Sequence, residues 1–264
     1  MTICLYKCIV IFGVNENHLP VVMIFYSLFF IYKKGFLDFT ANNINRKAGI
    51  YMLQTFKHAT KRKNLYLRVA NGHFATNDRH SNYYIDVAAQ KARLSEAKAV
   101  AEELSSYFLH STVVDTILCL DGMEVVGACL ADKLTKENFA SINAHNTIYV
   151  TAPETTYSNQ LLFRDNIVPM IKGKHVLILA VSYSSGKTIE AAIDAVKYYG
   201  GFISCVSAIF STVDESKEGI PIYSCFNPDF LGDYNSYPSH DCPMCKAGKK
   251  IDALINCHGY SILK

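Results

Sequence analysis

Residues 175–201 read HVLILAVSYSSGKTIEAAIDAVKYYGG. The continuous apolar run from His175 to Val181 is typical of a strand that is buried on both faces of a parallel sheet. Thr188 to Tyr199 has helical periodicity, and Gly200-Gly201 marks the end of that helix. A strand, a loop and a helix in this order form part of a right-handed crossover, so we expect a ligand site at the carboxyl end of the strand, over residues 182–188.

The neighbouring sequence continues this alternation of helices and strands. Leu94 to Leu109 places apolar residues at three- and four-residue spacing with Glu and Lys between them, which predicts an amphipathic helix. The fold class that we expect is α/β, with a central and mostly parallel sheet flanked by helices. The other elements predicted are strands at Thr116–Leu120, Thr147–Thr151 and Phe202–Phe210 and a helix at Val125–Lys133.

The loop between the strand and the helix has the composition of a phosphate cradle. Its residues are small or polar, and they stand where backbone N–H groups meet the positive end of a helix dipole. They are Ser184, Ser185, Gly186, Lys187 and Thr188. The last three also match the end of a nucleotide-binding P-loop, but the leading glycine of that motif would fall on Val181. A plain tight turn is the alternative to a phosphate site.

This segment resembles the phosphoribosyl pyrophosphate-binding motif of the type I phosphoribosyltransferases, in which an apolar strand is followed by two acidic residues and a loop of the form T-T-G-x-T. On this match Ser184, Ser185, Gly186 and Thr188 would hold the 5′-phosphate. The resemblance implies a type I phosphoribosyltransferase-like fold and a small-molecule phosphoribosyl compound or nucleotide as ligand. It also implies magnesium where phosphoribosyl pyrophosphate is bound, and a homodimer.

Two further segments resemble the orotate phosphoribosyltransferases of that family. Residues 72–86, GHFATNDRHSNYYID, are similar to the signature that lines the pyrimidine site, which makes Arg79, Tyr83 and Tyr84 candidate base contacts. Residues 121–131, DGMEVVGACLA, resemble the pyrophosphate loop. The three matches keep the family's order and spacing, and they imply transfer of phosphoribose to a pyrimidine-type base in pyrimidine nucleotide metabolism. The candidate pyrophosphate-loop residues are Asp121, Gly122, Met123 and Glu124.

The sequence departs from the family pattern at the residues that carry charge. The two acidic residues that grip the ribose hydroxyls should fall at positions 180 and 181, which are Ala180 and Val181. Residues 150–160 contain no basic residue to neutralise a leaving pyrophosphate, and Thr76 stands where the orotate relatives have a lysine. Such charged contacts contribute roughly 2 to 4 kcal/mol each to a transition state, so we expect transfer to be slowed by orders of magnitude. The cations left to supply charge are Lys187, Arg164 and Lys172.

Composition limits the classes of function. The chain has 264 residues, 50% of them hydrophobic, and a net charge of +3 from 26 basic and 23 acidic side chains. Both signs are spread along the sequence, which gives no support to nucleic-acid binding. Among nine cysteines, Cys119, Cys129 and Cys205 lie in apolar stretches, as buried thiols do. A reducing, cytoplasmic compartment fits this usage.

The first 51 residues differ in character from the rest. Leu19 to Tyr32 is an uncharged apolar run, but a helix of that length spans roughly 21 Å, which is short of the ~30 Å hydrocarbon core. We therefore do not expect a membrane partner. The segment is interpreted either as a weak anchor or as a leader upstream of a true start at Met52, because Arg46 to Tyr51 could be encoded by a purine-rich ribosome-binding stretch.

The C-terminal part contains a C-x-x-C knuckle at Cys242 and Cys245, which can place two thiolates on one zinc ion. Cys225 is the candidate third ligand, although a second C-x-x-C is lacking. A tight turn that packs against the core is the alternative, and Asn227–Ser239 is expected to be a surface loop. The other residues that could complete the ligand set are His240, Cys257 and His258.

These observations give a domain division and two hypotheses. We expect an apolar leader at 1–51, a phosphoribosyltransferase-like domain at 52–215 and a C-terminal tail at 216–264 packed on it. The first hypothesis is an enzyme of the orotate phosphoribosyltransferase type. The alternative is a catalytically inactive sensor or regulator that binds a nucleotide or sugar phosphate on the same fold, which the replacement of the acidic pair favours.

Overall fold

The computed structural model describes residues 53–60, 64–136, 141–144, 147–156 and 160–263. Leu53–Lys264 form one compact unit. The predictions made for residues 1–51 lie outside the described residues. Within the described part of the chain, no helix is both long enough and apolar enough to cross a membrane.

The centre of the unit is a five-stranded sheet in which every neighbouring pair of strands is parallel, in the order β10-β9-β8-β4-β5. This confirms the predicted α/β class. The strand β8 extends two residues beyond the predicted run and ends at Tyr183, directly before the small-residue loop. The strands of this sheet are β4 (Thr116–Cys119), β5 (Tyr149–Thr151), β8 (His175–Tyr183), β9 (Phe202–Ser211) and β10 (Ile222–Phe226).

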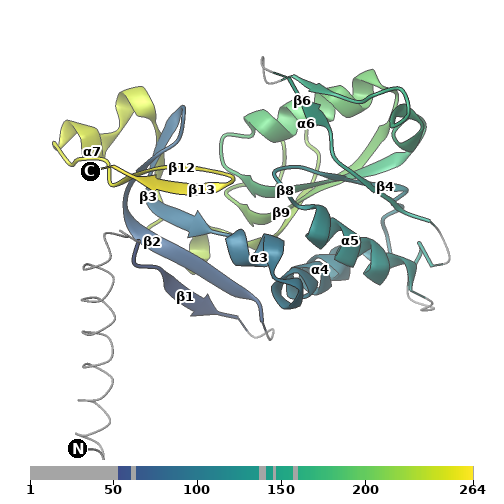
Figure 1. Cartoon of the computed structure of the whole chain (residues 1–264), viewed down its shortest axis with the longest axis horizontal. Coiled ribbons are helices and arrows are strands. Elements are labelled where there is room, and N and C mark those ends of the chain that lie inside the picture. Colours follow the sequence, from purple (N-terminus) through teal and green to yellow (C-terminus); the bar gives the residue numbers. More distant parts are fainter. Residues whose placement is uncertain (1–52, 61–63, 137–140, 145–146, 157–159, 264) are drawn as a thin grey trace, which may run out of the picture. The chain divides into compact units, whose positions relative to one another are not determined.

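Helices cover both faces of this sheet. Alternate residues of β8 point to opposite faces, and each face packs against a different set of helices. Leu177 and Leu179 pack with the apolar faces of α4 and α5, whereas Val176, Ile178 and Ala180 pack with α6. Figure 1 shows α6 on one side of β8 and β9 and the pair α4 and α5 on the other. The helices are α3 (Ala88–Ala92), α4 (Leu94–Phe108), α5 (Glu124–Thr135), α6 (Lys187–Tyr198) and α7 (Pro243–Lys246), with 3-10 turns η2 (Val168–Met170), η3 (Pro228–Phe230) and η4 (Ser239–Asp241).

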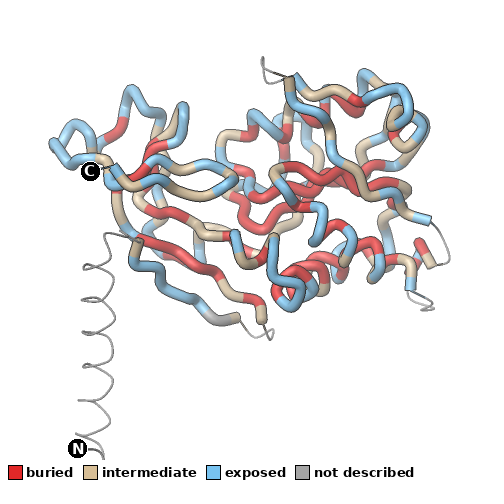
Figure 2. The backbone as a smooth tube through the Cα atoms, viewed as in Figure 1, coloured by how far each residue is buried: buried red, intermediate tan, exposed pale blue. Residues whose placement is uncertain are grey.

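Burial follows from this layering. The buried segments gather along β8 and β9, which are covered on both faces, whereas the segment around α7 is mostly exposed (Figure 2). Fully burying one aliphatic side chain contributes about 1.5 to 3 kcal/mol relative to leaving it exposed. The continuous apolar run of β8 therefore stabilises the fold on both of its faces.

A second, mostly antiparallel sheet was not predicted from the sequence. Its order is β11-β3-β2-β12-β13, and β1 also pairs with β2. The segment expected to be a loop at Asn227–Ser239 contributes η3 and the edge strand β11. The strands are β1 (Phe56–Ala59), β2 (Tyr66–Ala75), β3 (Arg79–Asp86), β11 (Ser236–Pro238), β12 (Ala253–Asn256) and β13 (Gly259–Ile262), and a separate short pair consists of β6 (Glu154–Thr155) and β7 (Leu161–Leu162).

The C-terminal strands enter this sheet beside its earliest strands. β12 runs parallel to β2, with Ala253 opposite Phe74, and β13 folds back antiparallel to β12. In Figure 1 the yellow C-terminal strands lie next to the blue strands β2 and β3. Residues of the C-terminal segment are thus integral to the second sheet.

A buried ion pair connects the second sheet to the helical layer of the first. Arg68 on β2 donates from Nη1 and Nη2 to the two carboxylate oxygens of Glu96 on α4, at 2.6 and 2.7 Å. The side chains are only 10% and 2% exposed, so both charges depend on each other for solvation. Leu67 and Val69 of β2 belong to the same hydrophobic cluster as α4.

Breaking this pair should destabilise the protein strongly. In Glu96→Gln the buried guanidinium keeps no charged partner, and we expect a loss of about 3 to 5 kcal/mol, which lowers Tm by roughly 6 to 20 °C in differential scanning calorimetry. Arg93 provides a matched control, because it also approaches Glu96, at 3.5 Å, but is 71% exposed. Arg93→Gln should change stability by less than about 0.5 kcal/mol. Equal effects of the two variants would contradict the structural role of Arg68.

Candidate functional site

A pocket of about 310 Å³ lies at the carboxyl edge of the parallel sheet. One wall is the loop between β8 and α6, and the opposite walls are the β2–β3 hairpin and the turn between β12 and β13. Ligands in open parallel sheets bind at this edge, where neighbouring loops diverge. The predicted 5′-phosphate residues all line this pocket: Ser184, Ser185, Gly186, Lys187 and Thr188.

The predicted phosphate loop ends in an open helix N-terminus. Gly186 is the N-cap of α6 with φ +78°, and among the described residues no side chain caps it. The first hydrogen bond of the helix is donated by Glu190 N–H to Gly186 O at 2.8 Å. The earlier N–H groups of α6 have no partner within the helix, so together with the helix dipole they favour an anion.

Glycine is required at position 186 for two reasons. A positive φ is costly for other residues, and a Cβ there would lie 2.5 Å from the hydroxyl oxygen of Tyr183. That hydroxyl cannot move aside freely, because it donates to Glu190 Oε1 at 2.7 Å. Burial, with the nearby Glu190 carboxylate, raises the pKa of Tyr183 to about 12. The buried phenol of Tyr183 therefore stays neutral, donates to Glu190 and packs against Gly186 of the loop.

The hairpin wall carries the predicted base contacts, and all three line the pocket. Arg79 donates from Nε to Ser236 Oγ at 2.9 Å and from Nη2 to Ser236 O at 2.7 Å, which fixes its guanidinium against β11. The neighbouring residues Tyr83 and Tyr84 point to opposite faces of the sheet. Tyr83 donates to Asp233, and the ring of Tyr84 lies 5.4 Å from that of Tyr260. The tyrosines are thus held by packing, and Arg79 is the charged member of this group.

The predicted pyrophosphate loop follows β4, the strand next to β8. Asp121 lines the pocket with φ +56°, and Lys91 on α3 donates to its carbonyl oxygen at 2.7 Å. Gly122, Met123 and Glu124 are not among the lining residues, and the side chain of Met123 is fully buried in the core. Only the first residue of the predicted loop faces the pocket.

Ala180 and Val181, which stand where the motif has two acidic residues, lie in different surroundings. Ala180 is fully buried against α6, whereas Val181 points to the other face and lines the pocket. An apolar side chain therefore borders the pocket at a position where the motif resemblance would place a carboxylate. The carboxylates among the lining residues are instead Asp78 and Asp121.

The basic residues that could replace the missing charges of the family lie in different places. Arg164 makes two hydrogen bonds to Glu154, at 2.6 and 2.7 Å, and neither Arg164 nor Lys172 lines the pocket. Lys187 does line it, and so does Lys91, which sequence reasoning missed. Lys91 was missed because nothing in its local sequence indicates that it reaches across to Asp121.

An ion pair spans the pocket mouth. Lys187 Nζ at the start of α6 lies 2.7 Å from Asp78 Oδ2 in the hairpin turn. The ammonium group lowers the pKa of Asp78, so this carboxyl remains ionised well below neutral pH and the pair is lost only as pH falls through that lowered value. Lys187 is 71% exposed, so the pair contributes little to stability. It places a negative charge beside the phosphate loop.

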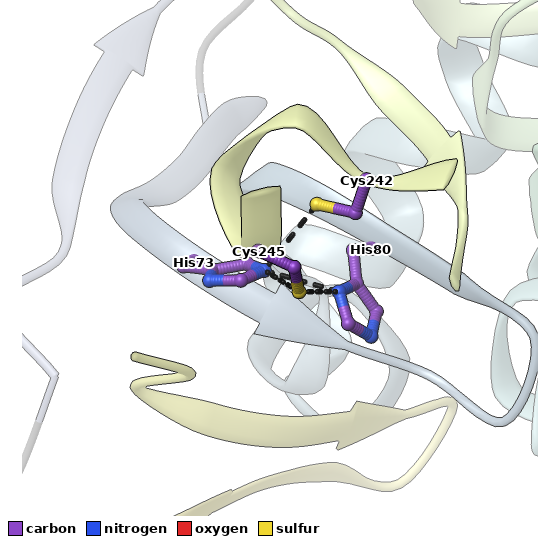
Figure 3. Close-up of side chains that lie close together, drawn as sticks. All are labelled: His73, His80, Cys242 and Cys245. Carbon is purple, nitrogen blue, oxygen red and sulfur yellow. Dashed lines mark hydrogen bonds between the residues drawn. The ribbon is translucent and has the colours of Figure 1, made fainter. Parts of the chain in front are cut away.

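A separate cluster contains the C-x-x-C cysteines. Cys242 and Cys245 lie together with His73 and His80, with their ligand atoms within 4.8 Å of one another (Figure 3). Cys225, the predicted third ligand, lies on β10 outside this group. The two histidines were overlooked because they lie far from the cysteines in sequence, although both occur within the segment 72–86.

Replacing Gly186 by Ala should damage the loop selectively. The positive φ costs about 1 to 2 kcal/mol in a non-glycine residue, and the contact with Tyr183 adds to it. We expect a fall in Tm of roughly 2 to 8 °C and a loss of phosphate binding of at least tenfold in calorimetric titration. Gly219→Ala is the control, since Gly219 also has a positive φ but no atom within 4 Å of its Cβ position. Phosphate binding that survives only in the control supports the loop assignment, and equal binding by both variants contradicts it.

Comparison with known proteins adds to this geometry. No family model matches the chain. It is 26% identical over 184 residues to the orotate phosphoribosyltransferase of Chlorobaculum parvum and 25% identical over 187 residues to that of Chlorobium phaeobacteroides, covering 69% of this chain and 86% of the relative in each case.

Among solved structures, the orotate phosphoribosyltransferase of Mycobacterium tuberculosis in complex with Fe(III) dicitrate is similar at 16% identity and a TM-score of 0.43, over 63% of this chain and 93% of that one. The sequence matches, rather than this structural likeness, confirm the resemblance indicated by the motifs. The chain thus resembles the orotate phosphoribosyltransferases, with Ala180 and Val181 at the positions where the motif of that family has two acidic residues.

Proposed function

We propose that the pocket binds a phosphoribosyl compound, either phosphoribosyl pyrophosphate or a pyrimidine nucleoside 5′-monophosphate, and that transfer of the phosphoribosyl group is slow or absent. The observation that carries this proposal is the open N-terminus of α6, with its serine-rich loop, on the same pocket as Arg79 of the hairpin. An anion site and a fixed guanidinium on opposite walls suit a ligand with a phosphate at one end and a polar ring at the other.

The end of the pocket that would bind the phosphate is better defined than the end that would bind the base. The backbone N–H groups at the start of α6 and the hydroxyls of Ser184 and Ser185 are donors of the kind that hold phosphate oxygens. Lys187 adds a positive charge at the same end. Charge-assisted hydrogen bonds of this kind are roughly twice as strong as neutral ones, so the phosphate should dominate affinity.

The opposite end of the pocket fits a base. Arg79 is held by two hydrogen bonds to Ser236, so little side-chain freedom is lost when it binds a carbonyl or carboxylate group of a pyrimidine. Tyr83 and Tyr84 are buried neighbours of this position. We therefore favour Arg79 as the residue that contacts the base.

Magnesium is part of the proposal for a pyrophosphate-bearing ligand. Asp121 provides a carboxylate at the carboxyl end of β4, and oxygen donors together with substrate phosphates are the ligands that Mg²⁺ prefers. The ion supplies charge neutralisation for the pyrophosphate when it is bound. Lys91, which donates to the backbone of Asp121, holds the loop in position.

The pocket lacks the electrostatic support that efficient transfer of the phosphoribosyl group requires. Positive charge develops on the ribose ring as the glycosidic bond loosens, and Val181 offers no carboxylate to stabilise it. The alternative, an active enzyme, is favoured by one observation, which is that Asp121 and Asp78 both line the pocket. Asp78 is already paired with Lys187, which leaves Asp121 as the carboxylate for that role.

The assembly and compartment are also proposed. We propose a homodimer, by analogy with the family, and a cytoplasmic protein, which is supported by the finding that none of the described cysteines forms a disulfide. The leader at 1–51, the domain at 52–215 and the tail at 216–264 packed on it remain the proposed division, with the tail contributing strands β10 to β13 to the two sheets. Light scattering coupled to size-exclusion chromatography tests the dimer.

Binding and turnover can be separated in one experiment. The full-length chain is titrated calorimetrically with phosphoribosyl pyrophosphate, orotate and orotidine monophosphate in the presence of magnesium, and each ligand that binds is then assayed for product. We expect binding of the phosphorylated ligands with turnover reduced by at least a thousandfold relative to an active orotate phosphoribosyltransferase. Efficient turnover would establish the enzyme alternative, and a failure of all three ligands to bind would refute the proposed function.

The ion pair at the pocket mouth predicts opposite effects for its two members. Asp78→Asn removes the negative charge beside the proposed phosphate loop, so orotidine monophosphate should bind up to about fivefold more tightly. Lys187→Met removes the positive charge, so orotidine monophosphate should bind about five- to tenfold more weakly, which corresponds to about 1 kcal/mol. Lys172→Met, which removes an exposed lysine outside the pocket, is the matched control. Weaker binding in Asp78→Asn would show that the phosphate does not occupy this loop.

A further inference from the structure

Four side chains from three separate segments converge beside the β2–β3 hairpin. His73 lies near the end of β2, His80 on β3, and Cys242 and Cys245 flank the start of α7 (Figure 3). We propose that these residues form a tetrahedral zinc site of the Cys₂His₂ type. This inference goes beyond the proposed function, because it concerns a metal ion held by protein side chains and does not depend on phosphate binding.

The distances between the ligand atoms are compatible with tetrahedral coordination of one metal ion. With Zn–N near 2.05 Å and Zn–S near 2.3 Å, tetrahedral geometry requires about 3.3 Å between two nitrogens and about 3.6 Å between a nitrogen and a sulfur. His73 Nε2 and His80 Nδ1 are 3.0 Å apart. The Sγ atoms of Cys242 and Cys245 lie 3.5 and 3.6 Å from His73 Nε2, and that of Cys245 lies 3.2 Å from His80 Nδ1. These four separations are within about 0.4 Å of the expected values, and the other two pairs of ligand atoms lie within 4.8 Å of each other.

The orientation of His73 favours the same interpretation. Its Nδ1 lies 2.9 Å from the carbonyl oxygen of Lys249. A carbonyl oxygen only accepts, so Nδ1 carries the proton and Nε2 directs its lone pair at the cluster. A metal-bound histidine usually donates its other ring N–H in this way, which fixes both tautomer and ring orientation.

The ligand types select zinc and a structural role. Two thiolates and two imidazoles suit Zn²⁺, whereas magnesium and calcium prefer oxygen ligands. Four protein ligands fill the coordination shell and leave no open position for substrate or water. His73, His80 and Cys242 are buried and Cys245 is exposed, so three of the four ligands are shielded from solvent.

The site would join the C-terminal segment to the pocket wall. His73 N–H donates to Asp252 Oδ2 at 2.7 Å, and Asp252 N–H donates back to His73 O at 2.8 Å, directly before β12 begins. His80 follows Arg79 in the chain and itself lines the pocket. Zinc at this position would therefore stabilise the hairpin that carries Arg79 without contacting a ligand.

The competing possibility is a disulfide between Cys242 and Cys245. Both cysteines are free in the structure. A disulfide gives no reason for two imidazole nitrogens to converge on the sulfurs, whereas zinc uses all four groups. Mass spectrometry of the purified chain distinguishes the two, because a disulfide removes two hydrogens from the intact mass.

The test measures metal content and spectrum on the full-length chain. We expect one zinc per chain by elemental analysis, and expect cobalt added to the metal-free protein to give the intense visible bands of tetrahedral Co²⁺ together with thiolate charge-transfer absorption. Zinc removal by a chelator should lower Tm by roughly 5 to 10 °C, reversibly on adding zinc back. A metal content near zero after purification and after zinc addition would overturn the site.

Variants assign the ligands. Cys245→Ser alters an exposed residue, so the chain should still fold by circular dichroism while its zinc affinity falls at least tenfold; His80→Ala tests the hairpin side. Cys225→Ser and Cys257→Ser are matched controls outside the cluster and should keep full zinc content. Unchanged cobalt spectra in both Cys245→Ser and His80→Ala would refute the assignment. Retention of zinc in a chain that binds no phosphorylated ligand would refute only the proposed function.

Discussion

Arg68 and Glu96 set the position of one sheet relative to the helical layer of the other. Arg68 belongs to β2 and Glu96 to α4, and these two elements also share a hydrophobic cluster through residues adjacent to the pair. Because neither charge has water as an alternative, β2 cannot slide along α4 without a large electrostatic cost. The hairpin that continues from β2 is thereby held over the carboxyl edge of the parallel sheet, and the pocket exists between the two.

The parallel sheet could be predicted from sequence because its signals are local. The run of β8 is continuous and apolar, and the predicted helix at Leu94–Leu109 differs from α4 by a single residue at its end. Buried strands and amphipathic helices are recognised by periodicity alone. The position of the loop between β8 and α6 was predicted equally well, since small residues between a buried strand and a helix mark such a loop, whereas its binding of phosphate stays a prediction.

The rest depends on contacts between distant segments, which periodicity does not encode. β12 joins β2 across most of the described chain, and β11 is a three-residue edge strand without a pattern of its own. Lys91 reaches Asp121 only because α3 and the loop after β4 meet in space. The same reason explains why the knuckle cysteines were noticed and their histidine neighbours were not: C-x-x-C is a local motif, whereas the hairpin places His73 and His80 together through strand pairing.

The place of β12 in the second sheet also has a consequence for the order in which the chain folds during synthesis. β1 covers the first half of one edge of β2, up to Val69, and β12 covers the same edge only at Phe74 and Ala75. A nascent chain that has already formed the hairpin therefore exposes unpaired backbone at Phe74 and Ala75 until the C-terminal residues leave the ribosome. Such an open edge is a template for pairing with other chains. Ribosome-bound intermediates of this protein are accordingly the stage at which a holdase chaperone has a defined strand edge to protect.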